Sequence, residues 1–242
     1  MIDGPISDDF FWFDESEPDS EFLDNDDDHF SSGSSDNWGW DEWGDLVVFR
    51  PIGHEPRYQY PLVVWLSVDD AIGLTLRDWF PDLSDRNYLG AEVSISPTLT
   101  VEQNANRVLL AIREIAAQYR VHRHRIWIAG VGPAADWVLR MLAECPGPVT
   151  GGVAISPSVA PTGVVTGQAP VIDPSKALYL ATESGADREA MVSVLAERGL
   201  KPGQYACPEW ESIDFSRLAV CRDLNIWLMQ QVCTPAGHDS CE

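Results

Sequence analysis

The stretch that decides the fold covers residues 106–131 and reads NRVLLAIREIAAQYRVHRHRIWIAGV. Its first part belongs to a longer segment, 101–119, in which apolar residues recur at three- and four-residue steps, a period that predicts an amphipathic helix. The residues on that face are Val101, Ala105, Val108, Ile112, Ile115 and Tyr119. Its second part, 125–131, is a short apolar run of the kind that forms a buried strand. A helix followed directly by a buried strand is typical of an α/β fold.

The same alternation extends in both directions along the chain. Strands are predicted at 46–50, 61–67, 88–95, 149–155, 177–181 and 204–207, and helices at 71–80, 134–145, 187–198 and 214–232. The strand at 61–67 (PLVVWLS) is apolar on both faces, which indicates a central parallel strand. The last helix places on one face Leu218, Cys221, Leu224, Leu228 and Val232. Because alternating strands and helices need crossover connections, the sequence predicts a doubly wound, mostly parallel α/β sheet with helices on both faces.

Residues 1–45 differ sharply from the rest of the chain in composition. They hold 16 of the 38 acids and no Lys or Arg, so they carry −16 of the net −22 and leave −6 on residues 46–242. They also contain large aromatic residues, among them the run FFWF at 10–13. Repulsion among unpaired carboxylates opposes an independent core. We therefore expect an acidic tail at 1–45, disordered or docked on its own chain or on a basic partner, then an α/β domain at 46–234 and a short tail at 235–242.

Charge and motif content exclude several classes of function. A net charge of −22 repels the phosphates of nucleic acids and anionic membranes. Asp3, Asp8 and Asp9 lie where a signal peptide needs neutral or basic residues, and no apolar run approaches about 18 residues, so we expect a cytoplasmic protein. The five cysteines include no C-x-x-C pair, which argues against zinc. Without a G-x-G-x-x-G or Walker-type loop, a nucleotide cofactor is not indicated, and we expect no cofactor.

Functional side chains are expected in the loops that follow the predicted strands, because ligand sites in such sheets lie at the carboxyl ends of the strands. Four loops meet this condition. They cover residues 67–70, the turn AGVGPAA at 129–135, residues 182–187 and residues 207–211.

The order and spacing of these segments resemble the carboxylesterase and phospholipase-like "predicted esterase" branch of the α/β-hydrolase superfamily. The resemblance covers about residues 46–234 and is carried best by 106–131 and by GGVAISPSV at 151–159. It implies that the turn after the 125–131 strand is the nucleophile elbow, which reads G-x-S-x-G in the family. The residues that match this pattern are Gly130, Val131, Gly132, Pro133 and Ala134.

The match places the nucleophile position on Gly132, which has no side chain with which to attack. The next residue, Pro133, lacks the backbone N–H that the family uses as one oxyanion donor. The second oxyanion element of the family is a loop of His-Gly and further glycines, whereas this chain has Ser67, Val68 and Asp69, followed by a second aspartate. Carboxylates at this point disfavour an oxyanion.

The resemblance also implies positions for the acid and the histidine of the triad. The acid falls on Gly185, between Glu183 and Asp187, either of which could substitute after a small shift. The histidine falls on Glu209 or Trp210. None of the five histidines lies in that loop: they are His29, His54, His122, His124 and His238.

Ester hydrolysis by acyl transfer needs a nucleophile, a base and oxyanion donors. We therefore predict a catalytically inactive, esterase-like homologue, a pseudoenzyme with a binding or structural role toward a protein or small-molecule ligand. The alternative is an active carboxylesterase-type serine hydrolase with relocated catalytic residues, such as Ser156 or Ser158. Two further hypotheses are a reactive thiol at Cys207 and a divalent cation bound by loop acids. Those acids are Asp69, Asp70, Glu183, Asp187 and Glu209.

Overall fold

The computed structural model describes residues 39–43, 46–68, 74–84, 86–145, 147–158, 172–197, 199–209 and 215–233. Some expectations fall outside this part of the chain. They concern most of the acidic tail, the tail at 235–242, and the positions Asp69, Asp70 and Trp210.

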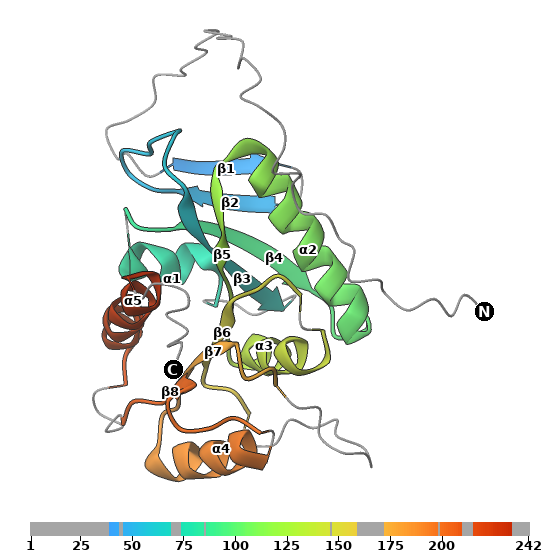
Figure 1. Ribbon diagram of the computed structural model, residues 1–242, viewed down its shortest axis with the longest axis vertical. Helices are drawn as coiled ribbons and strands as arrows, with labels where there is room; N and C mark the ends of the chain where they lie inside the picture. The colour runs from blue at the N-terminus through green and yellow to red at the C-terminus, as the bar shows by residue number, and fades with distance from the viewer. Residues whose placement is uncertain are drawn as a thin grey trace, which may run out of the picture. The chain divides into compact units, whose positions relative to one another are not determined.

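An eight-stranded sheet forms the centre of the domain, with the order β1-β2-β4-β3-β5-β6-β7-β8 (Figure 1). The strands are β1 Gly39–Trp43, β2 Leu46–Arg50, β3 Tyr60–Val68, β4 Leu89–Ile95, β5 Val121–Val131, β6 Gly151–Ile155, β7 Ala177–Ala181 and β8 Tyr205–Ala206. β2 pairs antiparallel with both β1 and β4, and the remaining pairs are parallel. The predicted doubly wound, mostly parallel sheet is confirmed.

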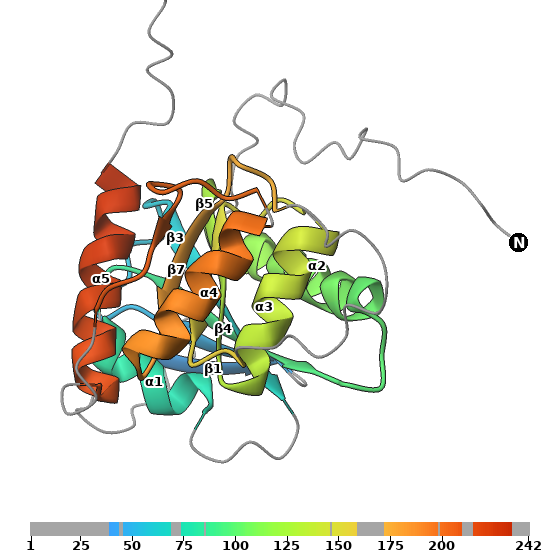
Figure 2. The same cartoon turned by 90° about the horizontal axis from the view of Figure 1, so that it is seen from below.

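Helices cover both faces of this sheet (Figure 2). They are α1 Leu76–Leu83, α2 Val101–Gln118, α3 Pro133–Glu144, α4 Gly185–Glu197 and α5 Arg217–Cys233. Residues of α1 and α5 share one apolar core, and residues of α2, α3 and α4 share the other. β5 contributes to both: Ile126 and Ile128 enter the core of α2 and α3, whereas Trp127, Ala129 and Val131 enter the core of α1 and α5. The run RIWIAGV is therefore apolar because each successive side chain enters a different core.

The first helix begins and ends later than predicted. α1 begins at Leu76, because the backbone N–H of Thr75 donates to the Asp78 carboxylate at 3.0 Å and fixes the first turn. It then continues through Pro81 to Leu83, so the predicted end at residue 80 is wrong. The N–H of Ser84 reaches the Phe80 carbonyl at 3.1 Å and closes the last turn around the proline.

The first strand corrects the expected domain boundary, because β1 lies within the segment assigned to the acidic tail. Trp40 packs edge-on against Phe49 with ring centroids 5.2 Å apart, and Trp43 stacks on Tyr119 at 5.7 Å. The Tyr119 hydroxyl also donates a hydrogen bond to Asp41. Burial of these rings favours strand pairing despite the surrounding acids. The domain therefore begins at least as early as β1.

The buried face of the last helix is the predicted one at Cys221, Leu224 and Leu228, but not at Leu218. Leu218 was expected to point inward but is 64% exposed. The buried side chains are Val220, Cys221, Leu224, Trp227 and Leu228. This set is centred near Leu224, and Leu218 lies to one side of it.

We expect β1 to set how far the chain can be shortened. A chain without residues 1–36 should keep its cooperative thermal melt, whereas a chain without residues 1–45 should lose about 1–3 kcal/mol of unfolding free energy. That figure is the sum of two aromatic pairs, each worth about 0.5–1.5 kcal/mol. Urea denaturation followed by circular dichroism measures both values. Equal stability of the two truncated chains would mean that β1 contributes nothing.

Candidate functional site

A single residue, Gly132, connects β5 to α3. Its φ of 56° and ψ of −122° lie in a region that glycine adopts without strain and other residues avoid. The Gly132 N–H donates to the Ile155 carbonyl at 2.8 Å, and the Gly132 carbonyl accepts from the N–H of Ala135 at 3.0 Å. These two bonds fasten the turn to β6 on one side and to the first turn of α3 on the other.

Gly130 allows α3 to start so close to the strand. A Cβ on Gly130 would lie 2.7 Å from the carbonyl carbon of Ala134, a distance that real Cβ atoms do not show. Gly132 is different, since a Cβ there would meet only the Leu74 side chain, at 3.7 Å. Leu74 is held by its carbonyl, which accepts a hydrogen bond from the Trp65 indole at 2.8 Å. Its side chain thus faces the position where the resemblance places the nucleophile, a contact that the sequence did not predict.

The two glycines should respond differently to substitution. Gly130→Ala forces the backbone of α3 away from β5, and we expect it to cost at least about 3 kcal/mol of unfolding free energy, in the range of severe overpacking. Gly132→Ala has room for its methyl group and should cost only the backbone strain, about 1–3 kcal/mol. Parallel urea titrations of the two variants provide the comparison. A larger loss for Gly132→Ala would contradict this account of the turn.

Few backbone N–H groups are free to stabilise an oxyanion at the described positions where the resemblance places the oxyanion donors. Pro133 is the first residue of α3, where a missing N–H removes no helical hydrogen bond. Ser67 and Val68 are the last residues of β3, and they pair with Ser94 and Ile95 of β4. Their backbone is therefore part of the sheet, while Asp69 lies outside the described residues.

The residues around Gly185 serve mainly to start α4. Gly185 is the first residue of that helix. The Ser184 hydroxyl donates to the Asp187 carboxylate at 2.7 Å, and the Asp187 N–H donates back to the Ser184 oxygen at 3.1 Å. This reciprocal arrangement is a helix cap, which engages Asp187 within its own turn. Glu183 instead accepts a hydrogen bond from the Ser156 hydroxyl, at 3.4 Å.

An arginine that the sequence analysis missed connects the loops after β7 and β8. Arg188 lies in the first turn of α4, and its Nε donates to the Cys207 carbonyl at 3.0 Å. Its Nη1 lies 2.9 Å from the Glu209 carboxylate. Glu209, one of the two positions that the resemblance assigns to the histidine, therefore carries an ion pair. It joins the two loops in which the family has its histidine and acid.

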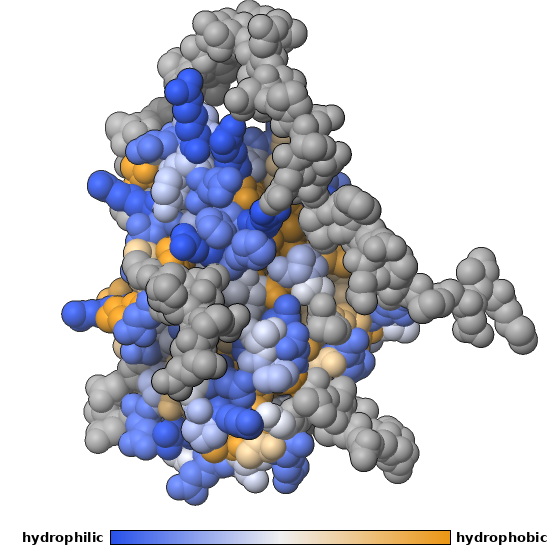
Figure 3. Space-filling model, viewed as in Figure 1, coloured by the Kyte–Doolittle hydropathy of each residue, from blue (hydrophilic) through white to orange (hydrophobic). Residues whose placement is uncertain are grey.

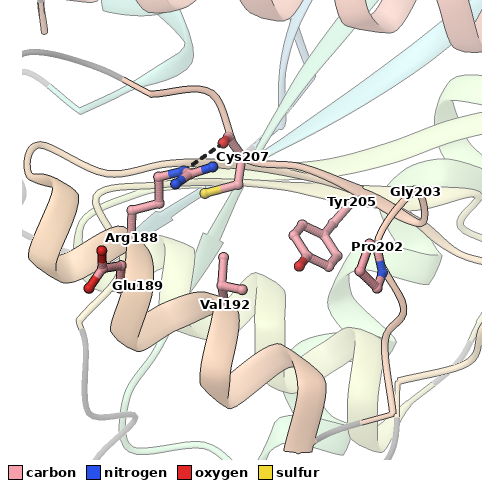
Figure 4. A pocket seen from close by; sticks show the side chains of 7 residues that line it. All are labelled: Arg188, Glu189, Val192, Pro202, Gly203, Tyr205 and Cys207. Carbon is pink, nitrogen blue, oxygen red and sulfur yellow. Dashed lines mark hydrogen bonds between the residues drawn. The ribbon is translucent and has the colours of Figure 1, made fainter.

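A cavity of about 300 Å³ lies beside this ion pair, between α4 and the segment around β8 (Figure 4). It is lined by Arg188, Glu189, Val192, Pro202, Gly203, Tyr205 and Cys207. Burial raises the pKa of the Cys207 thiol, although the Arg188 guanidinium lowers it in part. A thiol that stays protonated at neutral pH is a poor nucleophile, which argues against a reactive Cys207.

Two more cavities are found elsewhere: one of about 390 Å³ between β8 and α5, and one of about 210 Å³ near the start of β3. None of the three cavities is lined by Gly132.

The serines after β6 lie close to two carboxylates. Ser156 has a φ of 49°, and among the described residues it is the one non-glycine residue with a positive φ. Its hydroxyl contacts Glu183, as above, and the N–H of Ser158 donates to Asp136 at 2.8 Å. Burial raises the pKa of Asp136, although its hydrogen bonds with Ser158 lower it in part.

The described histidines lie away from these serines. His122 and His124 lie in the first half of β5, and His54 lies in the loop before β3 and stacks on Tyr60 at 5.1 Å. All three are at the amino end of the sheet, whereas Ser156 is at its carboxyl end. His29 and His238 lie outside the described residues. In the part of the chain that the structure describes, no group of three or more His, Cys, Asp or Glu side chains is placed to bind a metal ion.

The ion pair of Arg188 with Glu209 should contribute little to the free energy of unfolding. The hydrogen bond from Arg188 to the Cys207 carbonyl should contribute more. Glu209 is 80% exposed, so solvent screens its attraction to Arg188, and we expect a coupling of about 0.2–1 kcal/mol between the two charges. Arg188→Ala should cost about 1–2 kcal/mol, because it also leaves the Cys207 carbonyl without this donor. A double-mutant cycle with Glu209→Gln, followed by urea denaturation, separates the two contributions. A coupling above about 2 kcal/mol would mean that the pair is far better shielded from solvent than its exposure indicates.

No family model and no curated protein sequence matches the chain. Solved structures do match. A fungal esterase from Rhizomucor miehei aligns over 76% of this chain and 78% of its own, with a TM-score of 0.54 and 16% identity. MGS-M1, an α/β-hydrolase enzyme from a deep-sea metagenome of the Medee basin, aligns over 81% of this chain and 95% of its own, with a TM-score of 0.50 and 9% identity.

The dipeptidyl peptidase 4 of Porphyromonas gingivalis aligns over 76% of this chain, with a TM-score of 0.53 and 12% identity. This chain spans about a third of that protein, 33% of its length. At identities this low, the comparisons establish the fold: the chain has an esterase-like α/β-hydrolase fold. No helix among the described segments is long and apolar enough to cross a membrane.

Proposed function

We propose that this protein is a catalytically inactive homologue of esterase-like α/β hydrolases and that it acts by binding a protein or a small molecule. The observation that carries the proposal is the residue at the turn between β5 and α3. Gly132 occupies the position that the resemblance assigns to the nucleophile, with space above it for a Cβ but no side chain present. Pro133 removes a backbone donor at the neighbouring position.

The ion pair between Arg188 and Glu209 supports the same proposal. In a catalytic triad, the hydrogen bond between acid and histidine orients the base. Here an arginine, which stays protonated, and a solvent-exposed carboxylate join the corresponding loops in place of a histidine and its acid. The loops keep their connection without an imidazole base.

The cavity beside Arg188 is our candidate for the ligand site of this homologue. Its volume of about 300 Å³ is at the lower end of the range of small-molecule pockets. Val192 and Tyr205 give it apolar walls, while Arg188 supplies a charged group at its edge (Figure 4). A small ligand with an apolar body and one hydrogen-bond acceptor toward Arg188 fits this lining, which also includes the Glu189 carboxylate.

Ester turnover and covalent labelling test the proposal. We expect the full chain to release no more p-nitrophenol from short-chain p-nitrophenyl esters than its Ser156→Ala variant does, and to remain unlabelled by a fluorophosphonate probe. Gly132→Ser should also stay at background, because a serine without a base and a full set of oxyanion donors loses several orders of magnitude in kcat. Turnover or labelling that Ser156→Ala abolishes would refute the inactive assignment.

One observation favours the alternative, an active hydrolase with a relocated nucleophile. Ser156 has a strained backbone at a strand end, and its hydroxyl contacts Glu183. Strained residues often mark functional positions. Against this, the Ser156 N–H is bound to the Ala181 carbonyl at 2.7 Å, and the described histidines lie at the other end of the sheet. The labelling experiment above decides between the two.

A further inference from the structure

The first half of β5 departs from regular pairing and displays a basic segment. β3 advances from Tyr60 to Leu62 while β5 advances from Val121 to Ile126, so the strand bulges outward between these two pairs. Residues 120–125, with the sequence RVHRHR, make up what we call the basic bulge. Two of its arginines, Arg120 and Arg123, are exposed, and Arg125 is half-buried. A bulge of this kind redirects side chains at the edge of a sheet.

The loop before β3 lies next to the bulge and adds one more arginine, Arg57, together with one acid, Glu55. The carbonyl of Arg120 accepts a hydrogen bond from the N–H of Tyr60 at 2.8 Å, which fixes the bulge against the start of β3. The ring of Tyr60 contacts that of Tyr58, with centroids 4.7 Å apart, and Tyr58 is 47% exposed. Arg57, which precedes Tyr58, is also exposed. The basic bulge, one further arginine and an exposed aromatic ring therefore meet at the amino end of the sheet.

Three of the arginines at this end have no ion pair among the described residues, although the Glu55 carboxylate lies in the same loop as Arg57. Elsewhere the arginines are commonly paired with acids: Arg50 with Asp41, Arg77 with Glu42, Arg140 with Glu144, Arg188 with Glu209 and Arg217 with Asp82. By contrast, Arg57, Arg120 and Arg125 form no ion pair with any described carboxylate.

The positive charges are also close to one another. Burial and then the charge of Arg125 lower the pKa of His122, with smaller contributions from His124 and Arg123. Figure 3 shows hydrophilic side chains over the part of the molecule where β5 begins in Figure 1.

We propose that the basic bulge, together with Arg57 and Tyr58, is a docking surface for an acidic peptide segment that carries aromatic side chains. Carboxylates of such a segment would pair with the guanidinium groups of this surface. Its aromatic rings would pack on Tyr58 and over the arginines, which stack on aromatic faces. Residues 1–38 of this chain have such a composition, with 13 acids and no Lys or Arg, so their sequence provides a natural probe.

A short acidic peptide fits this surface better than a nucleic acid does. The chain carries −22 overall, and −6 over residues 46–242, so a long polyphosphate would extend from the bulge into a negative field. Salt at 0.1 M screens charges beyond about 10 Å, so a short segment senses mainly the bulge itself. The surface lies at the opposite end of the sheet from Gly132. The proposal therefore stands whether or not the protein hydrolyses esters.

The test is fluorescence anisotropy of a labelled peptide with the sequence of residues 8–28, DDFFWFDESEPDSEFLDNDDD, at 50 and 200 mM salt. It is run on the full chain and on a full-length variant whose acids between residues 3 and 28 are changed to Asn or Gln, which removes competition from the chain's own segment. We expect saturable binding to at least the second protein, weaker at the higher salt. Tighter binding by the second protein than by the first would identify the chain's own segment as an occupant.

Charge reversal locates the surface. Arg120→Glu with Arg125→Glu, placed in whichever protein binds, should weaken Kd about tenfold or more, since each reversal replaces an attraction with a repulsion. Arg57→Glu gives a second variant if the first melts at a lower temperature. The matched control is Arg107→Glu with Arg222→Glu, two exposed arginines on α2 and α5 that change the net charge equally. We expect the control to stay within about twofold, as a distant, screened charge should.

Three outcomes would overturn the proposal. They are the absence of peptide binding by both proteins, an equal loss in the control variant, and tighter binding of a charge-matched DNA oligonucleotide than of the peptide. A peptide with its acids replaced by Asn and Gln should not bind. If it binds as well as the acidic one, charge pairing is not what the surface recognises.

Discussion

The close approach of α3 to β5 is the constraint on which the rest of the domain depends. The helix must leave the strand within one residue, because Gly132 alone connects them. Only the absence of a Cβ at Gly130 leaves room for the Ala134 backbone. With α3 fixed there, its apolar side packs over β5 and β6, and the Gly132 N–H reaches the neighbouring strand. A central strand with a core on each face then orders the helices on both sides of the sheet.

The packing role of Gly130 changes how the elbow motif in the sequence is interpreted. Gly130 is required by packing whether or not residue 132 performs chemistry, so the glycine of an elbow is evidence of a fold rather than of an activity. The same holds for the connection between the loops after β7 and β8. Arg188 joins them through the Cys207 carbonyl and the Glu209 carboxylate, and such a connection stabilises the loops without any reacting group. The contacts that hold these elements together are therefore separate from any catalytic groups. Each of them uses backbone atoms or the Arg188 guanidinium.

The sequence predicted the elements whose signal is local. Residues 101–131 predict a helix by periodicity and a strand by an apolar run. The helix has nearly the expected bounds, whereas the strand begins at Val121 rather than at residue 125. β1 was missed because its acids obscure the strand, while the rings against which Trp40 and Trp43 pack come later in the chain. Arg188 was missed for a similar reason, since the carbonyl that it binds is 19 residues away. Leu74 follows the expected oxyanion loop, and nothing local indicates that its side chain faces Gly132. Contacts of this kind depend on tertiary packing, which periodicity does not encode.

In a parallel sheet, charged residues at the starts of the strands lie at one edge and those that follow the strands lie at the other, because all parallel strands run in the same direction. In this chain Arg120 and the first half of β5 form an arginine-rich stretch, whereas Glu183, Asp187 and Glu209 follow β7 and β8. The carboxyl end, where α/β folds commonly bind anionic ligands, is therefore the more acidic end among the described residues. An anionic partner is repelled there and attracted at the amino end. This reversal follows from the order of charged residues along the chain. It is a physical reason to look for the docking surface of an acidic peptide partner at the amino end, separately from the small cavity beside Arg188.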